Sequence, residues 1–261
     1  MESITIPNIS KKFILEKNGY YVCRIGNVEA TACLTKTIGQ LETNAGFYGT
    51  DDKLEDFIKL YLDSLKNADI NMMVVSCNSF RLVDRMLVNN NIYIPSIPYM
   101  EIPAPYLNIM QAIHDANEQL IIVSHFADEI EKQMKKLNYI WPQYKFKKDF
   151  IKVVKSYNTT YEKPHKDYFE SLEDLKQRAL DDGVKYYFVS CGAYGIPLCS
   201  HLKNNKKNVI YIGGILQILF GLMGSRWETR NEIRSLMNMH WMYPSNEKYN
   251  ALMKIENGCY I

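Results

Sequence analysis

One short stretch of the sequence combines a glycine turn with residues that bind phosphate or metal ions. In "CRIGNVE", Arg24 and Gly26 precede Asn27 and Glu29. An arginine guanidinium can form paired hydrogen bonds with phosphate oxygens. The side-chain oxygens of Asn27 and Glu29, two residues apart, can bind a hard divalent cation such as Mn²⁺ or Mg²⁺. An ion pair between Arg24 and Glu29 that closes a turn would fit the same residues.

Two glycine turns further along the chain offer a second kind of phosphate contact. "CGAYGIPL" contains Gly192 and Gly195, and "YIGGILQ" contains the pair Gly213 and Gly214. Each turn follows a hydrophobic run and precedes an amphipathic segment, which predicts a strand, a turn and a helix. Because glycine has no Cβ atom, a phosphate can approach the backbone N–H groups at the start of such a helix. The candidate phosphate-binding residues are Gly26, Gly192, Ala193, Tyr194, Gly195, Gly213, Gly214 and Gln217.

Arg226 and Trp227 follow the second glycine turn and place a guanidinium beside an aromatic ring. This pair can hold a phosphate or a sugar ring by charge and stacking. A structural role fits each candidate as well, since the glycines can serve tight turns and helix packing and Arg226 can cap a surface helix. The sequence leaves both interpretations open.

Segments with strand and helix patterns alternate along the chain and must position these residues. Strand patterns cover residues 20–26, 71–77, 119–126, 150–157 and 185–191, and the hydrophobic run before Gly213. Helix patterns cover residues 29–40, 54–65 behind a cap at Thr50 or Asp51, 80–88, 127–137 and 171–181. This alternation predicts an α/β fold with a Rossmann-like, mostly parallel sheet and helices on both faces. Such sheets bind ligands at the carboxyl ends of their strands, where the glycine turns are expected.

A proline-rich segment interrupts this pattern. Residues 92–106, "IYIPSIPYMEIPAPY", contain four prolines. Proline has no backbone N–H to donate and a fixed φ angle, so the segment is expected to be extended and irregular rather than regular strand or helix.

Composition and charge limit the possible partners. A chain of 261 residues that is 47% hydrophobic can bury a large core, and without a convincing linker one domain over residues 1–261 is expected. Lys and Arg number 31 against 29 Asp and Glu, and the net charge of +2 gives no field suited to a nucleic-acid backbone. We therefore expect no nucleic-acid partner, and the oligomeric state stays open.

The cysteines and the apolar segments indicate a cytoplasmic protein. The six cysteines form no Cys-x-x-Cys pair and follow no secretory signal, which is typical of reduced thiols. The longest strongly apolar segment, residues 209–223, is interrupted by glycines and Gln217 and is too short to span a bilayer. No transmembrane segment is expected.

Three separated motifs and the C-terminal residues resemble one family. "RIGNVE", "VSHFADEIEKQ", "GAYGIPL…IGGILQILFGLMGSRW" and the terminal "IENGCYI" occur in the order found in bacterial and viral glycosyltransferases of the GT-D fold. The resemblance extends over nearly the whole chain. It implies a Rossmann-like sheet, a nucleotide-sugar donor, a glycan acceptor, and a divalent cation held against the donor diphosphate by an Asp-x-Glu motif.

The metal motif of the family falls on Asn27 and Glu29 of this sequence, after Arg24 and Gly26. Asn27 stands where the family has aspartate, so the site has one negative charge fewer and an amide oxygen as a weaker ligand for Mn²⁺ or Mg²⁺. The assignment that results gives the catalytic work to Glu29, Arg24 and Arg226 and the metal to Glu29 and Asn27. His125 is a second departure, at a position where similar sequences tend to have proline.

The expected function is transfer of a sugar from a nucleotide-sugar donor to a glycan acceptor in surface polysaccharide or glycoprotein assembly. Such a reaction needs a base for the acceptor hydroxyl, and Glu29, Asp128 and Glu228 are alternatives for it. A non-catalytic nucleotide- or glycan-binding module of the same fold is the alternative function, because Asn27 weakens the metal motif. A methyltransferase of Rossmann type is a third reading, but "YIGG" stands where a ribose-binding acidic residue would be expected.

Overall fold

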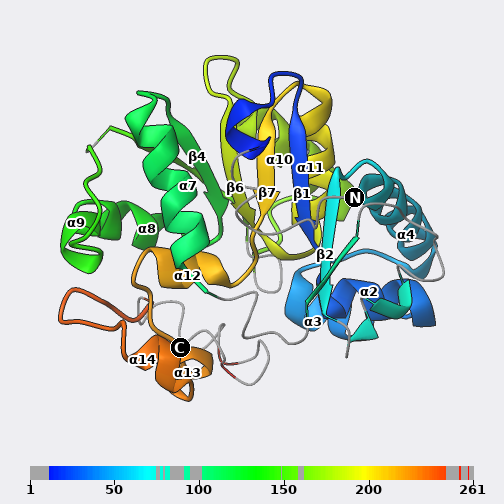
Figure 1. Cartoon of the computed structure of the whole chain (residues 1–261). Coiled ribbons are helices and arrows are strands. Elements are labelled where there is room, and N and C mark those ends of the chain that lie inside the picture. The colour runs from blue at the N-terminus through cyan, green and yellow to red at the C-terminus, as the bar shows by residue number, and fades with distance from the viewer. Residues whose placement is uncertain are drawn as a thin grey trace.

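Strands of the computed structural model form one parallel sheet (Figure 1). The structure describes residues 12–74, 77–78, 80–82, 91–94, 102–147, 149–157, 162–244, 253 and 258. Within these ranges the sheet has seven strands in the order β3-β2-β1-β7-β6-β4-β5, and every neighbouring pair is parallel. The strands are β1 Tyr20–Arg24, β2 Ile70–Val74, β3 Asn91–Ile94, β4 Leu120–Ser124, β5 Ile151–Lys155, β6 Tyr186–Ser190 and β7 Asn208–Tyr211. The expected α/β fold with a parallel sheet is confirmed.

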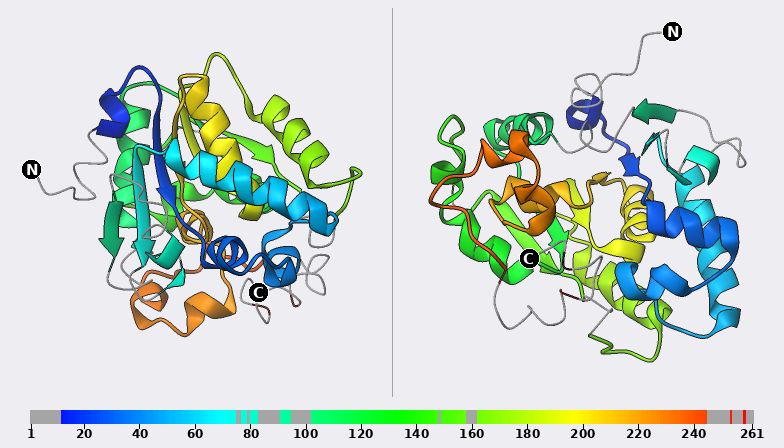
Figure 2. Two further views of the ribbon diagram at one scale, coloured as in Figure 1. Left: turned by 90° about the vertical axis from the view of Figure 1, so that its right-hand side faces the viewer. Right: turned by 90° about the horizontal axis from the view of Figure 1, so that it is seen from below.

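Helices cover both faces of the sheet (Figure 2). The first face packs against α7 Ala104–Asp115, α8 Ala127–Met134, α9 Leu137–Ile140 and α12 Ile215–Leu219. The second face packs against α2 Asn27–Thr35, α3 Gly39–Ala45, α4 Asp51–Lys66, α10 Tyr168–Ala179 and α11 Gly195–Asn204. Parallel strands must be joined by crossovers, and the right-handed sense of these crossovers sends connections that run in opposite directions along the sheet to opposite faces.

Side chains of alternating strand residues build the two cores. In β1, Tyr20 and Val22 belong to the core of the first face, whereas Tyr21 and Cys23 belong to the core of the second face. Successive side chains of a strand point to opposite sides, so a strand buried on both faces is hydrophobic at nearly every position. This is why β1, β4, β6 and β7 appear in the sequence as short continuous hydrophobic runs.

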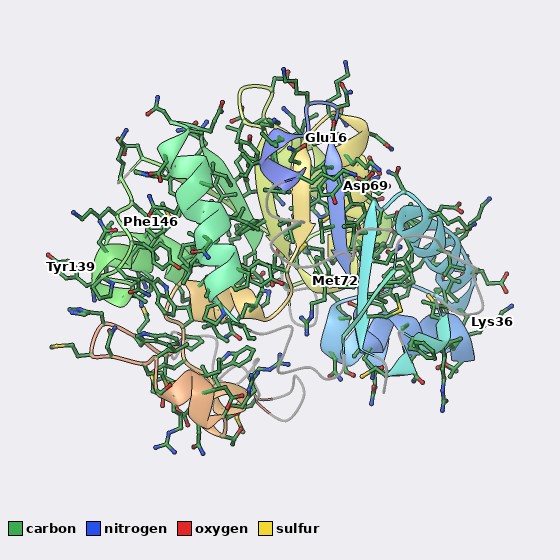
Figure 3. The ribbon with its side chains drawn as sticks, in the orientation of Figure 1. Glu16, Lys36, Asp69, Met72, Tyr139 and Phe146 are labelled. Carbon is green, nitrogen blue, oxygen red and sulfur yellow. The ribbon has the colours of Figure 1, made fainter. Side chains whose placement is uncertain are left out.

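A polar interaction fixes the second face near the amino ends of the strands (Figure 3). Asp69, just before β2, accepts a hydrogen bond at 2.8 Å from the backbone N–H of Tyr21 and forms an ion pair at 2.9 Å with Lys203 of α11. The carboxylate therefore joins β1, the start of β2 and a helix. It lies at the end of the sheet opposite to the candidate site.

The proline-rich segment is more regular than the sequence predicts. Ile92–Ile94 lies in β3, and α7 begins at Ala104 with Pro103 at its N-cap. Prolines are tolerated in the first turn of a helix because the N–H groups there have no partner within the helix. Residues 95–101 and 83–88, the second part of a predicted helix, lie outside the described residues. The predicted helix over residues 29–40 is divided into α2 and α3, since Lys36 adopts a left-handed conformation.

After β7 and α12, residues 221–242 form a closed excursion from the sheet, a long loop whose two ends lie side by side. α13 Ser225–Glu228 and α14 Asn231–Arg234 lie in it. At its base, Met223 N–H donates to the Met242 carbonyl at 2.8 Å and Met242 N–H donates to the Gly221 carbonyl at 2.9 Å. These two backbone hydrogen bonds hold the ends of the excursion together.

The described cysteines are free thiols. Cys23, Cys191 and Cys199 are buried, and Cys33 and Cys77 are half-buried. Burial raises the pKa of Cys23 and of Cys33 to about 12. Cys259 lies outside the described residues. No helix within the described ranges has the length and apolar character needed to cross a bilayer.

Replacement of Gly192 should test how β6 is joined to α3. Gly192 has a φ angle of +55°, and a Cβ atom at this position would collide with the carbonyl oxygen of Ala45 at the end of α3. Gly192→Ala is expected to lower the free energy of unfolding by about 1–3 kcal/mol, measured by urea denaturation. Gly183→Ala, at an exposed glycine without a positive φ, should change it by less than about 0.5 kcal/mol. Equal losses in the free energy of unfolding of the two variants would show that the contact between Gly192 and Ala45 contributes nothing specific to stability.

Candidate functional site

The carboxyl ends of β1, β7 and β6 form the edge at which most of the predicted site residues gather. Tyr20 of β1 and Tyr186 of β6 both pair with Asn208 of β7 at their amino ends, and by this register the three strands end within one residue of the same level. From this edge the chain leaves β1 and β6 toward the second face but leaves β7 toward the first. Opposite exits from neighbouring strands mark the position at which α/β sheets bind ligands. In Figure 1 this edge is the lower one, between α2 and α12.

Two arginine side chains meet at the glycine pair that follows β7. Gly213 has a φ angle of +59°, and Nη1 of Arg24 occupies the space that a Cβ atom of Gly213 would need. A Cβ atom on Gly214 would lie 3.1 Å from Nη1 of Arg226. Arg24 is the last residue of β1 and Arg226 lies in α13, so the fold brings together residues that are far apart in the sequence. The missing side chains of both glycines make room for the guanidinium groups.

A buried tryptophan supports Arg226. The Cζ atom of Arg226 lies 4.7 Å from the ring centroid of Trp227, which is fully buried. Trp227 Nε1 donates to Gln217 Oε1 at 3.2 Å, and the backbone N–H of Gln217 donates to the Gly214 carbonyl at 3.1 Å. Gln217, predicted as a donor contact, is 2% exposed and instead connects Trp227 to the glycine pair. Gln217 is thus linked to Arg226 through the Trp227 ring, and its contact with a donor stays a prediction.

Asn27 and Glu29 lie in the first turn of α2 but face different surroundings. The Glu29 side chain is 6% exposed and folds back on Gly26, where a Cβ atom would lie 2.9 Å from its Cδ. Burial and, second, the charge of Glu29 raise the pKa of Cys33, which packs against the core of the second face, to about 12. Asn27 is exposed, and its Oδ1 accepts the backbone N–H of Asn78 at 2.9 Å.

The arrangement of Asn27 and Glu29 does not fit a shared metal ion. Residues two apart in a helix point in different directions, and here one oxygen is turned into the protein while the other already accepts a hydrogen bond. Among the described residues, no cluster of three or more His, Cys, Asp or Glu side chains could hold a metal ion. Asn27 and Glu29 therefore face different surroundings in this structure, and a cation shared by the two stays a prediction.

Aromatic packing accounts for the turn after β6. Atoms of the Tyr211 ring occupy the space that a Cβ atom of Gly195 would need, and Tyr211 Oη donates to the Gly192 carbonyl at 3.2 Å. Tyr168 Oη donates to the Ala193 carbonyl at 2.9 Å, and the rings of Tyr168 and Tyr194 stack with centroids 4.5 Å apart. The contacts of Gly192, Ala193, Tyr194 and Gly195 support packing, rather than phosphate binding, as the reason for this motif.

The three candidate bases differ in their surroundings. Glu29 is buried, and Asp128 at the start of α8 forms an ion pair with Lys155 of β5 at 3.6 Å. Glu228 is half-buried in α13, and its carboxylate accepts a hydrogen bond from Tyr243, which raises the pKa of that phenol. Glu228 is the candidate that shares a short helix with Arg226.

Two other sequence features lie apart from the arginine pair or outside the described residues. His125 follows β4, and its ring centroid lies 4.1 Å from that of Phe126. In the terminal motif "IENGCYI", Gly258 is the one described residue, and its carbonyl oxygen accepts a hydrogen bond at 3.0 Å from Ser225 at the start of α13.

The sequence analysis missed Asn78, whose backbone N–H donates a hydrogen bond to the side chain of Asn27. The sequence feature that could have indicated Asn78 is its place as a polar residue directly after the strand pattern of residues 71–77.

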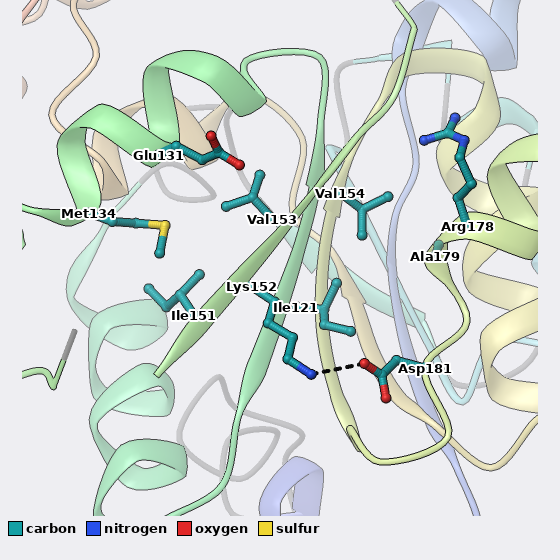
Figure 4. A pocket seen from close by; sticks show the side chains of 10 residues that line it. All are labelled: Ile121, Glu131, Met134, Ile151, Lys152, Val153, Val154, Arg178, Ala179 and Asp181. Atoms are coloured by element: carbon teal, nitrogen blue, oxygen red, sulfur yellow. Dashed lines mark hydrogen bonds and ion pairs between the residues drawn. The ribbon is translucent and has the colours of Figure 1, made fainter. Parts of the chain in front are cut away.

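A groove of about 430 Å³ follows the edge strand β5 (Figure 4). Both of its basic side chains are paired: Lys152 with Asp181 at 3.0 Å, and Arg178 with Asp174 at 2.7 Å. None of the residues predicted as site residues lines it. The groove is therefore separate from the candidate site.

Comparison of the chain with protein-family models, with curated proteins and with solved structures finds no match. The functional proposal consequently rests on the geometry of the site and on the motifs of the sequence.

The role of Gly213 can be tested with a matched glycine. Gly213→Ala should displace Arg24 and weaken binding of inorganic pyrophosphate about tenfold, since one charge-assisted contact contributes roughly 1.5 kcal/mol or more. Gly19 also has a positive φ angle, +93°, but it precedes β1 at the amino end of the sheet, and a Cβ atom there would meet the backbone of Lys203 instead of an arginine. Gly19→Ala therefore provides a comparable backbone strain away from the candidate site. Both variants should lose stability, and only Gly213→Ala should lose pyrophosphate affinity in calorimetric titration. An unchanged affinity of Gly213→Ala for pyrophosphate would contradict the assignment of a phosphate site to this turn.

The metal assignment has its own test. Because Glu29 is turned toward Gly26 and Asn27 toward Asn78, Glu29→Gln should leave the affinity for Mn²⁺ unchanged in titrations without nucleotide. Asn27→Asp keeps the oxygen that accepts the Asn78 N–H and should not raise that affinity. A loss of about tenfold or more in folded Glu29→Gln protein would show that the carboxylate binds the ion after all.

Proposed function

We propose that this protein is a glycosyltransferase that moves a sugar from a nucleotide-sugar donor to a glycan acceptor. The observation that supports this most is the pair Arg24 and Arg226 at the side-chain-free turn of Gly213 and Gly214, at the carboxyl edge of a parallel sheet. Two guanidinium groups on one turn match the charge of a diphosphate. The motif resemblance to GT-D glycosyltransferases supplies the substrate class.

The chemistry follows from charge. When the bond between the anomeric carbon and the diphosphate breaks, negative charge grows on the leaving phosphate oxygen and positive charge on the sugar. Arg24 and Arg226 would stabilise the departing diphosphate. Their positions are set by β1 and by the Trp227 ring before substrate binds, so little reorganisation is needed during the reaction.

The acceptor hydroxyl must lose a proton as it attacks the anomeric carbon. Of the three candidate bases we propose Glu228, because its side chain is half-buried. Glu29 is buried against Gly26, and Asp128 is paired with Lys155. The phenol of Tyr243 orients the Glu228 carboxylate.

A non-catalytic nucleotide- or glycan-binding module of the same fold is a second candidate. The separation of Asn27 and Glu29 favours it, since these residues stand at the positions of the family's metal motif and do not face one cation. The module would bind its nucleotide or glycan without cleaving a donor, whereas the enzyme binds the donor and cleaves it. The free thiols of the described cysteines fit a reducing cytoplasm, which we propose as the location.

Nucleotide binding should depend on both arginines. At about 100 times its dissociation constant, a cognate nucleoside diphosphate should stabilise the fold by roughly 2.7 kcal/mol. Arg24→Lys and Arg226→Lys keep the charge but lose the planar fork, so each should weaken binding by about tenfold or more. Arg178→Lys, at the β5 edge, is the matched control. Thermal melting with uridine, guanosine, adenosine, cytidine and thymidine diphosphates measures this effect, and no shift with any of them would contradict the proposal.

The same variants separate the enzyme from the binding module. With a panel of nucleotide sugars, the unmodified protein should release nucleoside diphosphate, and Glu228→Gln should bind the nucleotide normally but release it far more slowly. Binding without release in the unmodified protein, with and without glycan acceptors, would favour the module.

A further inference from the structure

A second surface, formed by α8, α9 and the loop after α14, exposes apolar side chains. Tyr139 is 64% exposed and Met239 is 91% exposed. The ring centroids of Tyr139 and His240 lie 5.1 Å apart, so the two segments meet here. Figure 3 shows Tyr139, a residue of α9, at the outer margin of the molecule.

Hydrogen bonds and buried rings hold the loop on the helices. Asn238 Nδ2 donates to the Ile140 carbonyl at 3.1 Å, and Gln133 Nε2 donates to the His240 carbonyl at 2.9 Å. Directly behind the surface, the rings of the buried residues Trp141 and Trp241 lie 5.9 Å apart. The exposure of Met239 and Tyr139 therefore belongs to an anchored structure rather than to a loose loop.

Four cations accompany these apolar side chains. Lys132, Lys135 and Lys136 are exposed on the segment that joins α8 and α9, and Arg234 is exposed at the end of α14. Backbone hydrogen bonds hold the two helices together at this point, since Lys136 N–H donates to the Gln133 carbonyl of α8 and the Tyr139 N–H of α9 donates to the Lys136 carbonyl. The lysines and Tyr139 consequently belong to one short, continuous stretch of the surface.

Acidic groups near these cations face elsewhere or are already paired. Glu131 lines the groove at β5 (Figure 4), and Glu232 forms an ion pair with Arg230 at 2.8 Å. Within the part of the chain that the structure describes, no ion pair involves the three lysines or Arg234. The surface is thus locally cationic on a chain whose net charge is only +2.

We propose that this basic–apolar patch, formed by Lys132, Lys135, Lys136, Tyr139, Arg234 and Met239, binds reversibly to membranes that contain anionic lipids. Cations near a bilayer are attracted by the negative headgroups, and exposed apolar side chains gain by entering the interface beneath them. A polyanion such as RNA would use the cations but would give no reason for an almost fully exposed Met239. The inference does not rest on the glycosyltransferase proposal.

Vesicle binding tests the patch. Sedimentation with vesicles of phosphatidylcholine alone and of phosphatidylcholine mixed with phosphatidylserine should show binding to the mixed vesicles, and added salt should weaken it. Each cation removed should lower the partition constant about fivefold, so Lys132→Gln with Lys136→Gln should lower it about 25-fold. Met239→Ser should lower it by about tenfold, because an apolar side chain no longer enters the interface.

Matched controls decide the outcome. Lys59→Gln with Lys66→Gln on α4 removes the same charge from a helix on the other face of the sheet and should leave binding unchanged. Absence of binding to the mixed vesicles, equal binding to phosphatidylcholine alone, or equal losses in the α4 variant would overturn the proposal. Binding to RNA that depends on the lysines but not on Met239, without vesicle binding, would identify a polyanion site instead. Nucleotide stabilisation should be unchanged in all these variants.

Discussion

The candidate site depends on the absence of side chains at Gly213 and Gly214. A single methyl group on Gly213 would collide with Arg24, and one on Gly214 would come to 3.1 Å from Arg226. Two like charges gain nothing from proximity to each other, so their convergence on one turn requires rigid supports on both sides. β1 supplies one support, and the buried ring of Trp227, held through Gln217, supplies the other.

The strand order places the turn of Gly213 and Gly214 at the edge of the sheet where a ligand is expected to bind. β7 stands between β1 and β6, and its chain leaves toward the face opposite to theirs. The order of strands therefore decides which loops meet, before any side chain at the edge is considered. The same handedness of crossovers that distributes the helices over two faces also produces the place for a ligand.

Much of the fold could be predicted from the sequence, because strands buried on both faces are continuous hydrophobic runs. β1, β4 and β6 are examples, and α4 and α8 follow from apolar residues at helical spacing. The helix α7 was missed since prolines in a first turn have the same appearance in the sequence as prolines that prevent a helix. The polar ends of strands also predicted that Arg24 and Gly213 would lie at one edge.

The direction of individual side chains could not be predicted. Asn27 and Glu29 were expected to share a cation, but the rotation of α2 about its axis turns one outward and the other inward. The ring of Tyr211 covers Gly195, a contact between two strand ends that no local pattern contains. The contact between Asn27 and Asn78 could not be predicted for the same reason. The backbone N–H of Asn78, which follows the neighbouring strand β2, donates a hydrogen bond to the Asn27 side chain.

The two backbone hydrogen bonds between residues 221–223 and Met242 make the excursion that carries α13 and α14 a closed unit. Its ends are already joined, so a change in its length alters loop-closure entropy only slightly and leaves the sheet undisturbed. One arginine of the pair belongs to the sheet and the other to this unit. A small rotation of this unit about its base would therefore change the distance between Arg226, which it carries, and Arg24, which is fixed in the sheet.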